Sequence, residues 1–342
     1  MTADRGPWAA NRQPLVSVIL VTWNSAPFLP RCLSGLAAQT HDGMELIAVD
    51  NGSSDGSADL VAATFPHAAI ICNETNTGFA HAVNQGVAVA RWEFVLLLNP
   101  DAMLSPEYVE RVVVAMTGTG AQFGAAAGKL MQARGTSIEP TDMVDSKGIR
   151  MTRTGRHIDI GQGRPDGADD RGLEPIAGTG LFEVFGVSGA AAMLRATFVR
   201  DAMIDGQLLD EDFFTFREDA DLAWRGRILG WRALHVPDAV GWHVRTVTPK
   251  RRKELSATIN MHSVKNRFLL RLKNEAAYLA VRHAPFEIAR DLLTVGAALT
   301  VERTSLPALR WLWQNRRRIL EKRRAVQRRR RVPDRDIARW FR

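Results

Sequence analysis

The chain has 342 residues, 46% of them hydrophobic and 24% charged, a composition that excludes a disordered chain and suits one large or two ordinary globular domains. Its formal net charge of +8 is unevenly distributed. The last 42 residues hold 15 Lys or Arg and 4 Asp or Glu, a net charge of +11, so residues 1–300 carry −3. The basic character therefore belongs to the C-terminal segment and says nothing about the rest of the chain.

The two cysteines, Cys32 and Cys72, are too few for a disulfide framework and have no metal-binding spacing. We expect both to be buried thiols in a reducing compartment. The first 13 residues lack the apolar core of a signal peptide. No uninterrupted apolar run reaches the roughly 18 residues of a membrane span. The stretch 276–301 is broken by ionisable side chains, namely Arg282, His283, Glu287, Arg290 and Asp291.

After a polar tail at 1–13, apolar runs of strand length alternate with helical patterns. Buried strands are predicted at 15–22, 45–50, 68–72 and 93–98. Helices are predicted between them, the first with Ser25 as its N-cap and another around 79–90. This order implies an α/β fold whose doubly wound, mostly parallel sheet is covered on both faces. In such a sheet, ligands bind beyond the carboxyl ends of the strands.

The second half of the chain has a less regular pattern. Residues 118–190 are rich in Gly, Asp and Arg, which predicts loops and a few short strands. A strand at 191–195, a helix at 219–229 and short strands near 231–236 and 239–244 follow. From about 250 the pattern is helical and basic to the end. We expect a tail at 1–13, halves at 14–117 and 118–245, and a basic amphipathic helical extension at 246–342.

Polar side chains follow two of the predicted strands. Asn99 and Asp101 leave the strand at 93–98 at positions i and i+2. Oxygen ligands suit Mg²⁺ or Mn²⁺, which keep few protein ligands and bind substrate phosphates, but Asn-Pro-Asp is also ordinary turn chemistry. Asp50 and Asn51 follow the second strand, where they could hydrogen-bond a base ring or form an ordinary βα turn.

Carboxylates also open the predicted helix at 219–229. Asp219 and Asp221 stand at the positive end of its dipole, where a capping role is common. A carboxylate at a helix start near a cleft can also act as a general base. Asp210 and Asp212 have the same spacing in a predicted loop. His243 follows a short apolar strand and is either structural or a contact to metal or phosphate.

Five segments in chain order resemble the inverting family 2 glycosyltransferases with the GT-A fold, and within them the bacterial rhamnosyltransferase-like branch. They are VSVILVTWNS (16–25), LIAVDNGSSDGS (46–57), NTGFAHAVNQG (76–86), LLLNPDA (96–102) and FFTFREDADLAWRGRILGWRALHVPDAVGWH (213–243). One such segment is a weak signal, whereas five in order at the expected strand ends are a strong one. The resemblance covers about 14–245 and includes a basic helical tail of a kind this branch often carries.

The resemblance implies a nucleotide-sugar-binding half at 14–117 and an acceptor-binding half at 118–245. The positions that match the nucleoside pocket are Thr22, Asn24, Asp50 and Asn51. The family often has a second Asp where this chain has Asn51. The positions that match the stretch beside the nucleotide and donor sugar are Gly78, Phe79 and Asn84.

The metal site and the base are also implied by the resemblance. Asn99 and Asp101 match the family's Asp-x-Asp motif with Asn in place of the first Asp, which leaves Asp101 as the principal protein ligand of a divalent metal, Mn or Mg. His243 matches a late His that completes the metal or diphosphate site. Asp219 matches the catalytic base, and Asp221 is a neighbour on the same helix.

The implied reaction moves a sugar with inversion from a nucleotide-diphosphate sugar onto a lipid-linked saccharide in cell-envelope polysaccharide synthesis. L-rhamnose from dTDP-rhamnose is the best guess for the donor, and another UDP- or GDP-sugar is the alternative. Outside the enzymes, the alternative is a nucleotide- or nucleic-acid-binding module without transferase activity. A steep fall of affinity with ionic strength would distinguish nucleic-acid binding.

The C-terminal segment combines arginine clusters with apolar side chains, namely Leu306, Leu309, Trp311, Trp313, Ile319 and Leu320. Arginine clusters attract nucleic-acid phosphates, and a solvated helical face or an oligomer contact would also suit this segment. Apolar faces bordered by Arg and aromatic side chains are, however, typical of helices in the headgroup region of an anionic membrane. We therefore expect 286–342 to contact an anionic membrane surface, no nucleic-acid partner, and a peripheral protein on the cytoplasmic face of the cell membrane.

Overall fold

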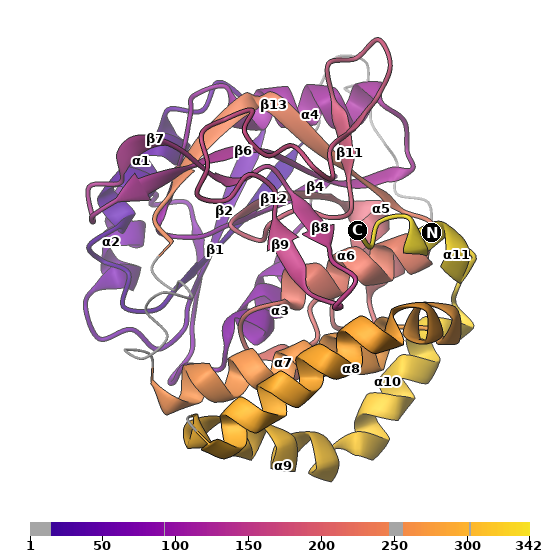
Figure 1. Ribbon diagram of the computed structural model, residues 1–342. Coiled ribbons are helices and arrows are strands. Elements are labelled where there is room, and N and C mark those ends of the chain that lie inside the picture. Colours follow the sequence, from indigo (N-terminus) through magenta and orange to yellow (C-terminus); the bar gives the residue numbers. More distant parts are fainter. Residues whose placement is uncertain (1–14, 92, 246–255, 301) are drawn as a thin grey trace, which may run out of the picture.

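The structure is a computed structural model that describes residues 15–91, 93–245, 256–300 and 302–342. The polar tail predicted at 1–13 and the start of the extension at 246–255 lie outside the described residues. A central sheet with helices on both faces forms the body of the molecule, and a layer of C-terminal helices lies along one side of it (Figure 1). The α/β class and the helical C-terminal extension are thus confirmed.

The N-terminal half alternates strands and helices in the predicted order. Its elements are β1 (Val16–Thr22), α1 (Leu29–Ala37), β2 (Met44–Asp50), α2 (Ser57–Thr64), β3 (Ala69–Cys72), α3 (Phe79–Val89) and β4 (Phe94–Leu98). The four strands are parallel in the order β3-β2-β1-β4. Ser25 is not the N-cap of α1: its carbonyl accepts hydrogen bonds from the N–H groups of Phe28 and Leu29, so it lies in the preceding turn.

The sheet continues beyond β4 with strands of mixed direction. β12 (Ala191–Arg195) pairs antiparallel with β4, and next come β6 (Phe123–Arg134), β13 (Arg232–His243), β11 (Phe182–Val184) and β10 (Glu174–Pro175). β5 (Ala102–Leu104) pairs with β13, and β7 (Glu139–Ser146) pairs with β6. The helices of this half are α4 (Tyr108–Gly118), α5 (Ala196–Ala202), the short 3₁₀ helix η1 (Glu211–Phe213) and α6 (Glu218–Ile228).

Two expectations for this half differ from the structure. The region 118–190, expected to be mainly loops, contains the 12-residue β6. Its first six residues, FGAAAG, are all buried, so the sequence there shows no alternation of polar and apolar residues. The strands expected near 231–236 and 239–244 are one strand, β13, with an irregularity between Val236 and Val240. Pro237 lies at that irregularity, where its missing N–H leaves a ladder bond unmade.

The thiols do not share one environment. Cys32 on α1 is buried, as expected, but Cys72 is exposed, so the prediction of two buried thiols was wrong for Cys72. The reason is its place in the sheet: β3 is the edge strand next to β2, and the side chains at both of its ends are exposed.

The C-terminal extension packs against the half of the chain at 118–245 rather than standing apart from it. It comprises α7 (Ala257–Asn274), α8 (Ala277–Thr300), the 3₁₀ helix η3 (Arg303–Ser305), α9 (Leu306–Gln314), α10 (Arg316–Arg328) and α11 (Asp334–Ala338). At the chain end, the rings of Trp340 and Phe341 lie 6.4 and 6.0 Å from the ring of Phe185. Among the described residues, none of the helices combines the length and apolar character that crossing a bilayer requires.

Candidate active site

A pocket of about 230 Å³ opens beyond the carboxyl end of β4. It brings together five of the residues predicted from the sequence, namely Phe79, Asn99, Asp101, Asp219 and His243. These residues come from α3, the end of β4, the start of α6 and the end of β13, so both halves of the chain contribute. The β8–β9 hairpin (Ile149–Met151 and His157–Asp159) closes the pocket with His157 and Asp159.

Strand pairing places His243 beside Asp101. The last residue of β13 is His243, which is opposite Ala102 of β5, the residue after Asp101. Its Nε2 lies 3.3 Å from Asp101 Oδ1, and its Nδ1 lies 2.8 Å from Asp145 Oδ2. Burial disfavours the imidazolium, but the carboxylates of Asp101 and Asp145 outweigh it and raise the pKa of His243 to about 10.

This pair has the chemistry of a small divalent-metal site. A carboxylate oxygen at Asp101 and an imidazole nitrogen at His243 suit Mn²⁺, and the buried Asp145 on the other ring nitrogen is a typical outer partner that orients the ring. The described residues contain no group of three or more His, Cys, Asp or Glu that could hold a metal. The residues present therefore fit a cation that takes its remaining ligands from water or from a bound diphosphate.

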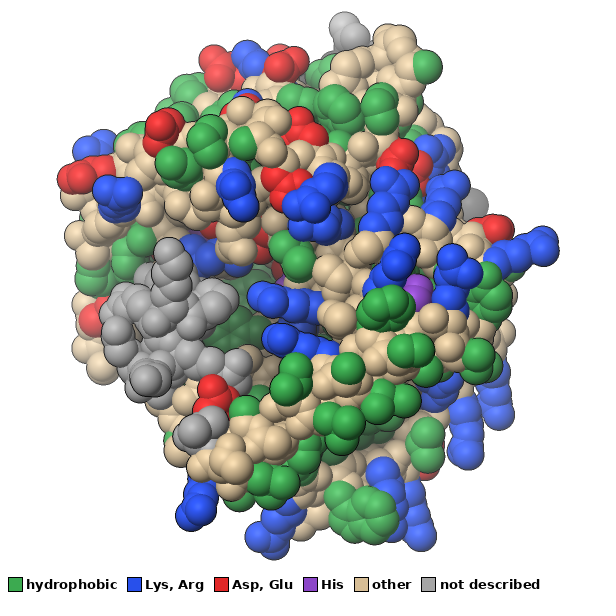
Figure 2. All heavy atoms as spheres, viewed as in Figure 1, with side chains coloured by type: hydrophobic (Ala, Val, Ile, Leu, Met, Phe, Trp, Pro, Cys, Tyr) green, Lys and Arg blue, Asp and Glu red, His purple; other side chains and the backbone are tan. Residues whose placement is uncertain are grey.

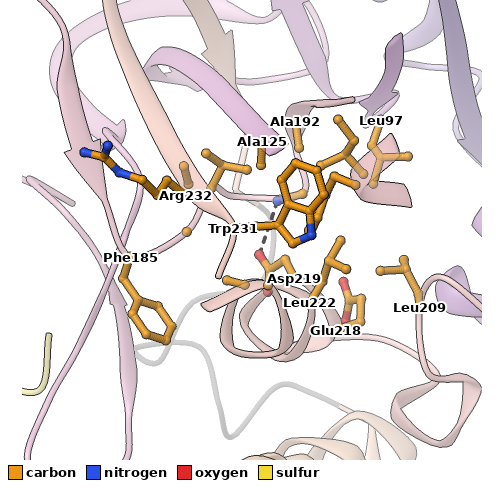
Figure 3. Close-up of a pocket in the computed structure, with 18 of the residues that line it drawn as sticks. Leu97, Ala125, Phe185, Ala192, Leu209, Glu218, Asp219, Leu222, Trp231 and Arg232 are labelled. Atoms are coloured by element: carbon orange, nitrogen blue, oxygen red, sulfur yellow. Dashed lines mark hydrogen bonds between the residues drawn. The ribbon is translucent and has the colours of Figure 1, made fainter. Parts of the chain in front are cut away.

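Asp219, the second residue of α6, faces the pocket from the other side. Its carboxylate accepts hydrogen bonds from the N–H groups of Gly189 (3.2 Å) and Ala220 (2.7 Å), and Figure 3 shows the first of these as a dashed line. Burial and the neighbouring charge of Asp159 raise the pKa of Asp219. A carboxylate with a raised pKa, held by two backbone donors at a pocket, is suited to accept a proton.

Glu218 lies next to Asp219 but has another environment. In Figure 3 the two carboxyl groups lie on different sides of the start of α6, next to a small apolar cavity of about 30 Å³ lined by Leu97, Ala192, Leu222 and Trp231 among others. Burial and the charge of Asp219 raise the pKa of Glu218 to about 8. The neutral form of Glu218 is therefore favoured at pH 7.

Arg245 adds positive charge to the pocket and connects its two sides. The guanidinium lies 2.9 Å from Asp145 and 2.8 Å from Asp159, so it joins the partner of His243 to the neighbour of Asp219. Sequence analysis missed Asp145 and Asp159, because the region 118–190 offers no readable periodicity. No local signal in the sequence links these residues to Arg245.

The loop before α6 has a backbone that most residues avoid. Phe214, Phe216 and Arg217 all have positive φ values, 65°, 67° and 71°. The Phe214 ring fills the space beside Gly78, where a Cβ would lie 2.5 Å from the ring. Gly78 itself has φ +93°. The glycine therefore lets the start of α3 pack against the loop that leads to Asp219.

Helix α7 holds the same loop from the other side. The Asn266 amide lies 2.9, 2.7 and 2.8 Å from the carbonyl oxygens of Phe213, Thr215 and Phe216. Sequence analysis missed Asn266. The available signal was a repeated Lys-Asn pair at 265–266 and 273–274, eight residues apart in the same helix.

The competing acidic pairs have structural partners. Asp210 and Asp212 are bound by Lys322 of α10, and Asp210 also by Lys273 of α7. Asp221 is fully buried and paired with Lys273 and Arg225. These carboxylates hold the C-terminal extension to the catalytic half.

The residues predicted for the nucleoside pocket gather at the ends of β1 and β2. The Thr22 hydroxyl donates to Asp50 (2.8 Å), and the Asn24 side-chain oxygen accepts from the N–H of Ser54 (2.9 Å). The Asn51 side-chain oxygen accepts from both the N–H and the hydroxyl of Thr77. These contacts tie three strand-end segments together, but Thr22, Asn24, Asp50 and Asn51 do not line the pocket that contains Asp101 and Asp219.

Asn84 does not join them. Its amide exchanges hydrogen bonds with the backbone of Leu209 (2.8 and 2.9 Å) and donates to Glu211 (3.0 Å). The structure gives Asn84 the contacts of a residue that joins α3 to the segment before η1.

Comparison with known proteins gives matches to glycosyltransferases. Residues 17–149 match the family model Glycosyl transferase family 2. The N-acetylglucosaminyl-diphospho-decaprenol L-rhamnosyltransferase of Mycobacterium tuberculosis is 26% identical over 245 residues, which cover 67% of this chain and 76% of that protein. The putative glycosyltransferase EpsH of Bacillus subtilis is 30% identical over 102 residues, but the match covers only 30% of its length.

Solved structures share the fold at low sequence identity. The crystal structure of GalNAc-T7 with UDP, GalNAc and Mn²⁺ has a TM-score of 0.58 and 12% identity over 77% of this chain and 48% of that one. S. aureus TarS 1–349 has a TM-score of 0.54 and 17% identity over 91% of this chain and 81% of that one. These likenesses confirm the GT-A-type fold.

Proposed function

Because the chain belongs to the family 2 glycosyltransferases, we propose that it transfers L-rhamnose from dTDP-rhamnose, with inversion, to a lipid-linked saccharide. The observation that carries the proposal is the pocket in which Asp219 faces Asp101 and His243. The printed name of the M. tuberculosis relative, a rhamnosyltransferase acting on a diphospho-decaprenol, supports both the donor and the lipid-linked acceptor. Another UDP- or GDP-sugar is the alternative donor.

The two sides of the pocket have separate roles in this reaction. Asp219 takes the proton of the acceptor hydroxyl while that oxygen forms a bond to the anomeric carbon. The bond from the anomeric carbon to the diphosphate breaks on the opposite face, which inverts the configuration. Arg245 lies where its positive charge stabilises the leaving diphosphate. A bound Mn²⁺ or Mg²⁺, held by Asp101 and His243, would supply further positive charge to the leaving group.

The activity is tested with a panel of donors. The purified chain is given dTDP-rhamnose, UDP-sugars or GDP-sugars with a polyprenyl-diphosphate N-acetylglucosamine acceptor and Mn²⁺, and product is measured by mass spectrometry. We expect transfer with dTDP-rhamnose. If only a UDP- or GDP-sugar supports transfer, that sugar nucleotide is the donor in place of dTDP-rhamnose. The absence of both transfer and donor hydrolysis with every donor would refute the proposal.

The role of Asp219 is tested by Asp219→Asn. Loss of the proton acceptor should lower kcat at least 10³-fold, in the range of general-base catalysis, while the Kd of the nucleotide sugar stays within a few fold. Asp142→Asn, which changes an exposed carboxylate, is the matched control and should keep wild-type turnover. Near-normal turnover of Asp219→Asn would remove it as the base.

We also propose that the extension contacts an anionic membrane surface, within 286–342 and chiefly through α8. On α8 the exposed apolar side chains include Ile288, Leu292 and Leu293, at 58%, 69% and 68% exposure. Figure 2 shows hydrophobic side chains along this helix with basic side chains around them. Such a face suits the interface of a bilayer with anionic lipids. A protein bound in this way would be peripheral, on the membrane face where the lipid-linked acceptor is presented.

Removing 301–342 is a poor test of this contact, because it would also remove Trp340 and Phe341 from the core. Substituting Ile288, Leu292 and Leu293 by Ser leaves the core intact and should abolish cosedimentation with phosphatidylglycerol vesicles. The control is Val114→Ser, which removes an equally exposed apolar side chain (63%) from α4. Unchanged cosedimentation of the triple variant would exclude α8 as the membrane contact.

A further inference from the structure

A cluster of three arginines lies between the active-site pocket and the exposed face of α8. Its members are Arg156 of the β8–β9 turn, Arg267 of α7 and Arg290 of α8. The turn of the β8–β9 hairpin reaches α8 (Figure 1): the Arg153 guanidinium lies 5.7 Å from the centre of the Phe286 ring. The backbone at Gly155 packs so closely on the Arg271 side chain that a Cβ would not fit. Arg156, the residue after Gly155, is thereby brought to the surface that α7 and α8 form.

The acidic side chains nearby neutralise the cluster only in part. Glu287 and Asp291 are both engaged by Arg271, the former at 3.0 Å. Arg267 of α7 is 7% exposed; its Nε lies 3.7 Å from Asp291, and its Nη2 has no hydrogen-bond partner. Within the described part of the chain, Arg156 and Arg290 form no ion pair.

The charges of the cluster act on one another. Burial and the charge of Arg290 lower the pKa of Arg156, and burial together with Arg290 lowers the pKa of Arg267 to about 10. Burial and the charges of Arg217 and Arg156 hold the pKa of His157 well below its ordinary value. Arg267 is buried, whereas Arg156 and Arg290 are exposed, and an anion between the three guanidinium groups would reduce their mutual repulsion.

The position of the cluster between the pocket and α8 indicates which part of a substrate that anion is. His157, directly after Arg156, lines the same pocket as Asp219, and its Nδ1 lies 3.4 Å from Arg217. On the far side, Phe286 belongs to the exposed apolar face of α8. In Figure 2, basic side chains gather at the edge of a hollow above that helix. An anion held here has the proposed base on one side and an apolar surface on the other.

We propose, on the premise that the acceptor is lipid-linked, that Arg156, Arg267 and Arg290 bind the diphosphate that joins the acceptor sugar to its lipid chain. The sugar then points to Asp219, and the lipid chain leaves along the apolar face of α8. Guanidinium groups bind phosphate oxygens through paired, charge-assisted hydrogen bonds, and a diphosphate offers enough oxygens for several of them.

The site is tested by direct binding of farnesyl diphosphate to the full chain, with no donor sugar present. The change in tryptophan fluorescence measures the binding. In the double variant R156A/R290A, the Kd of farnesyl diphosphate should rise at least tenfold, while the weaker binding of farnesol stays unchanged. The matched control is R324A/R328A, which removes two exposed arginines of α10 and should bind farnesyl diphosphate like wild type. Wild-type affinity of R156A/R290A for farnesyl diphosphate would overturn the site.

Two further arms separate the sources of phosphate. Inorganic pyrophosphate should compete with farnesyl diphosphate in the wild type and not in R156A/R290A. Phosphatidylglycerol vesicles should bind both proteins within a few fold, since the apolar face of α8 is intact. If R156A/R290A loses vesicle binding but keeps farnesyl diphosphate, the arginines bind lipid headgroups and the proposed diphosphate site is wrong.

Turnover distinguishes this site from the proposed function itself. In the transfer assay, R156A/R290A should raise KM for the lipid-linked acceptor at least tenfold and leave KM for the nucleotide sugar within a few fold. If the chain binds farnesyl diphosphate through these arginines but transfers no sugar, the proposed function fails and the site stands. If it transfers sugar and the variant has a wild-type acceptor KM, the site fails and the function stands.

Discussion

Lys273 of the C-terminal extension donates a 2.7 Å hydrogen bond to Asp221, which lies two residues after Asp219 on α6. A second 2.7 Å bond from the same ammonium group goes to Asp210, and both Lys273 and Asp221 are fully buried. The basic extension is therefore joined to the half of the chain at 118–245 through charges that water does not reach. Lys322, which lies within the last 42 residues, also pairs with Asp210, so part of the positive charge of the C-terminal segment serves internal pairing.

Replacing Lys273 by Met should destabilise the whole chain. The Met side chain keeps the aliphatic volume but leaves Asp221 with Arg225 and Asp210 with Lys322 as their remaining cations. We therefore expect a loss at or below the lower end of the about 3–5 kcal/mol that breaking a buried ion pair typically costs. The free energy of unfolding from urea titration measures this. Arg324→Met, on the exposed side of α10, should change it by less than about 0.5 kcal/mol. A loss below about 1 kcal/mol for Lys273→Met would mean that the pair is dispensable.

Asn266→Ala should lower turnover more than it lowers stability. The amide holds three carbonyl groups of the loop in which Phe214, Phe216 and Arg217 have positive φ, and without it the loop can relax and shift the start of α6. We expect kcat to fall at least tenfold with KM for the nucleotide sugar within a few fold. Asn260→Ala, on the same helix, is the control. Equal kcat values for Asn266→Ala and wild type would show that the loop holds its shape alone.

Much of the fold followed from the sequence, and the reasons are visible in particular elements. The buried strands β1, β2 and β4 are short apolar runs, so hydrophobic pattern alone locates them. β6 escaped because FGAAAG has no alternation, and its burial depends on tertiary packing. In the pocket, Asp101 and His243 were predicted through family resemblance, whereas Asp145 and Arg245 became visible only when strand pairing brought residues a hundred positions apart together.

Glu218 gives the chain a pH dependence of stability with a definite sign. Its pKa is raised to about 8 in the folded chain from an ordinary 4.5, because burial and the charge of Asp219 disfavour the carboxylate. The folded state thus binds the proton more tightly, and its stability falls as pH rises from 4.5 towards 8. Glu218→Gln should make the free energy of unfolding fall less between pH 5 and pH 8. Parallel curves for the variant and wild type over this range would contradict the raised pKa.

Asp101→Asn should weaken the response to metal more than it weakens nucleotide-sugar binding. The carboxylate and His243 are the two protein groups that would hold the metal, so neutralising Asp101 removes the charged ligand and leaves an amide oxygen in its place. We expect the Mn²⁺ concentration for half-maximal turnover to rise at least tenfold, and chelator to stop turnover of the wild type. Asp142→Asn, an exposed carboxylate outside the pocket, should respond to Mn²⁺ like wild type. Turnover that persists in chelator, or an unchanged Mn²⁺ response of Asp101→Asn, would mean that the leaving diphosphate is stabilised by the protein's own cations.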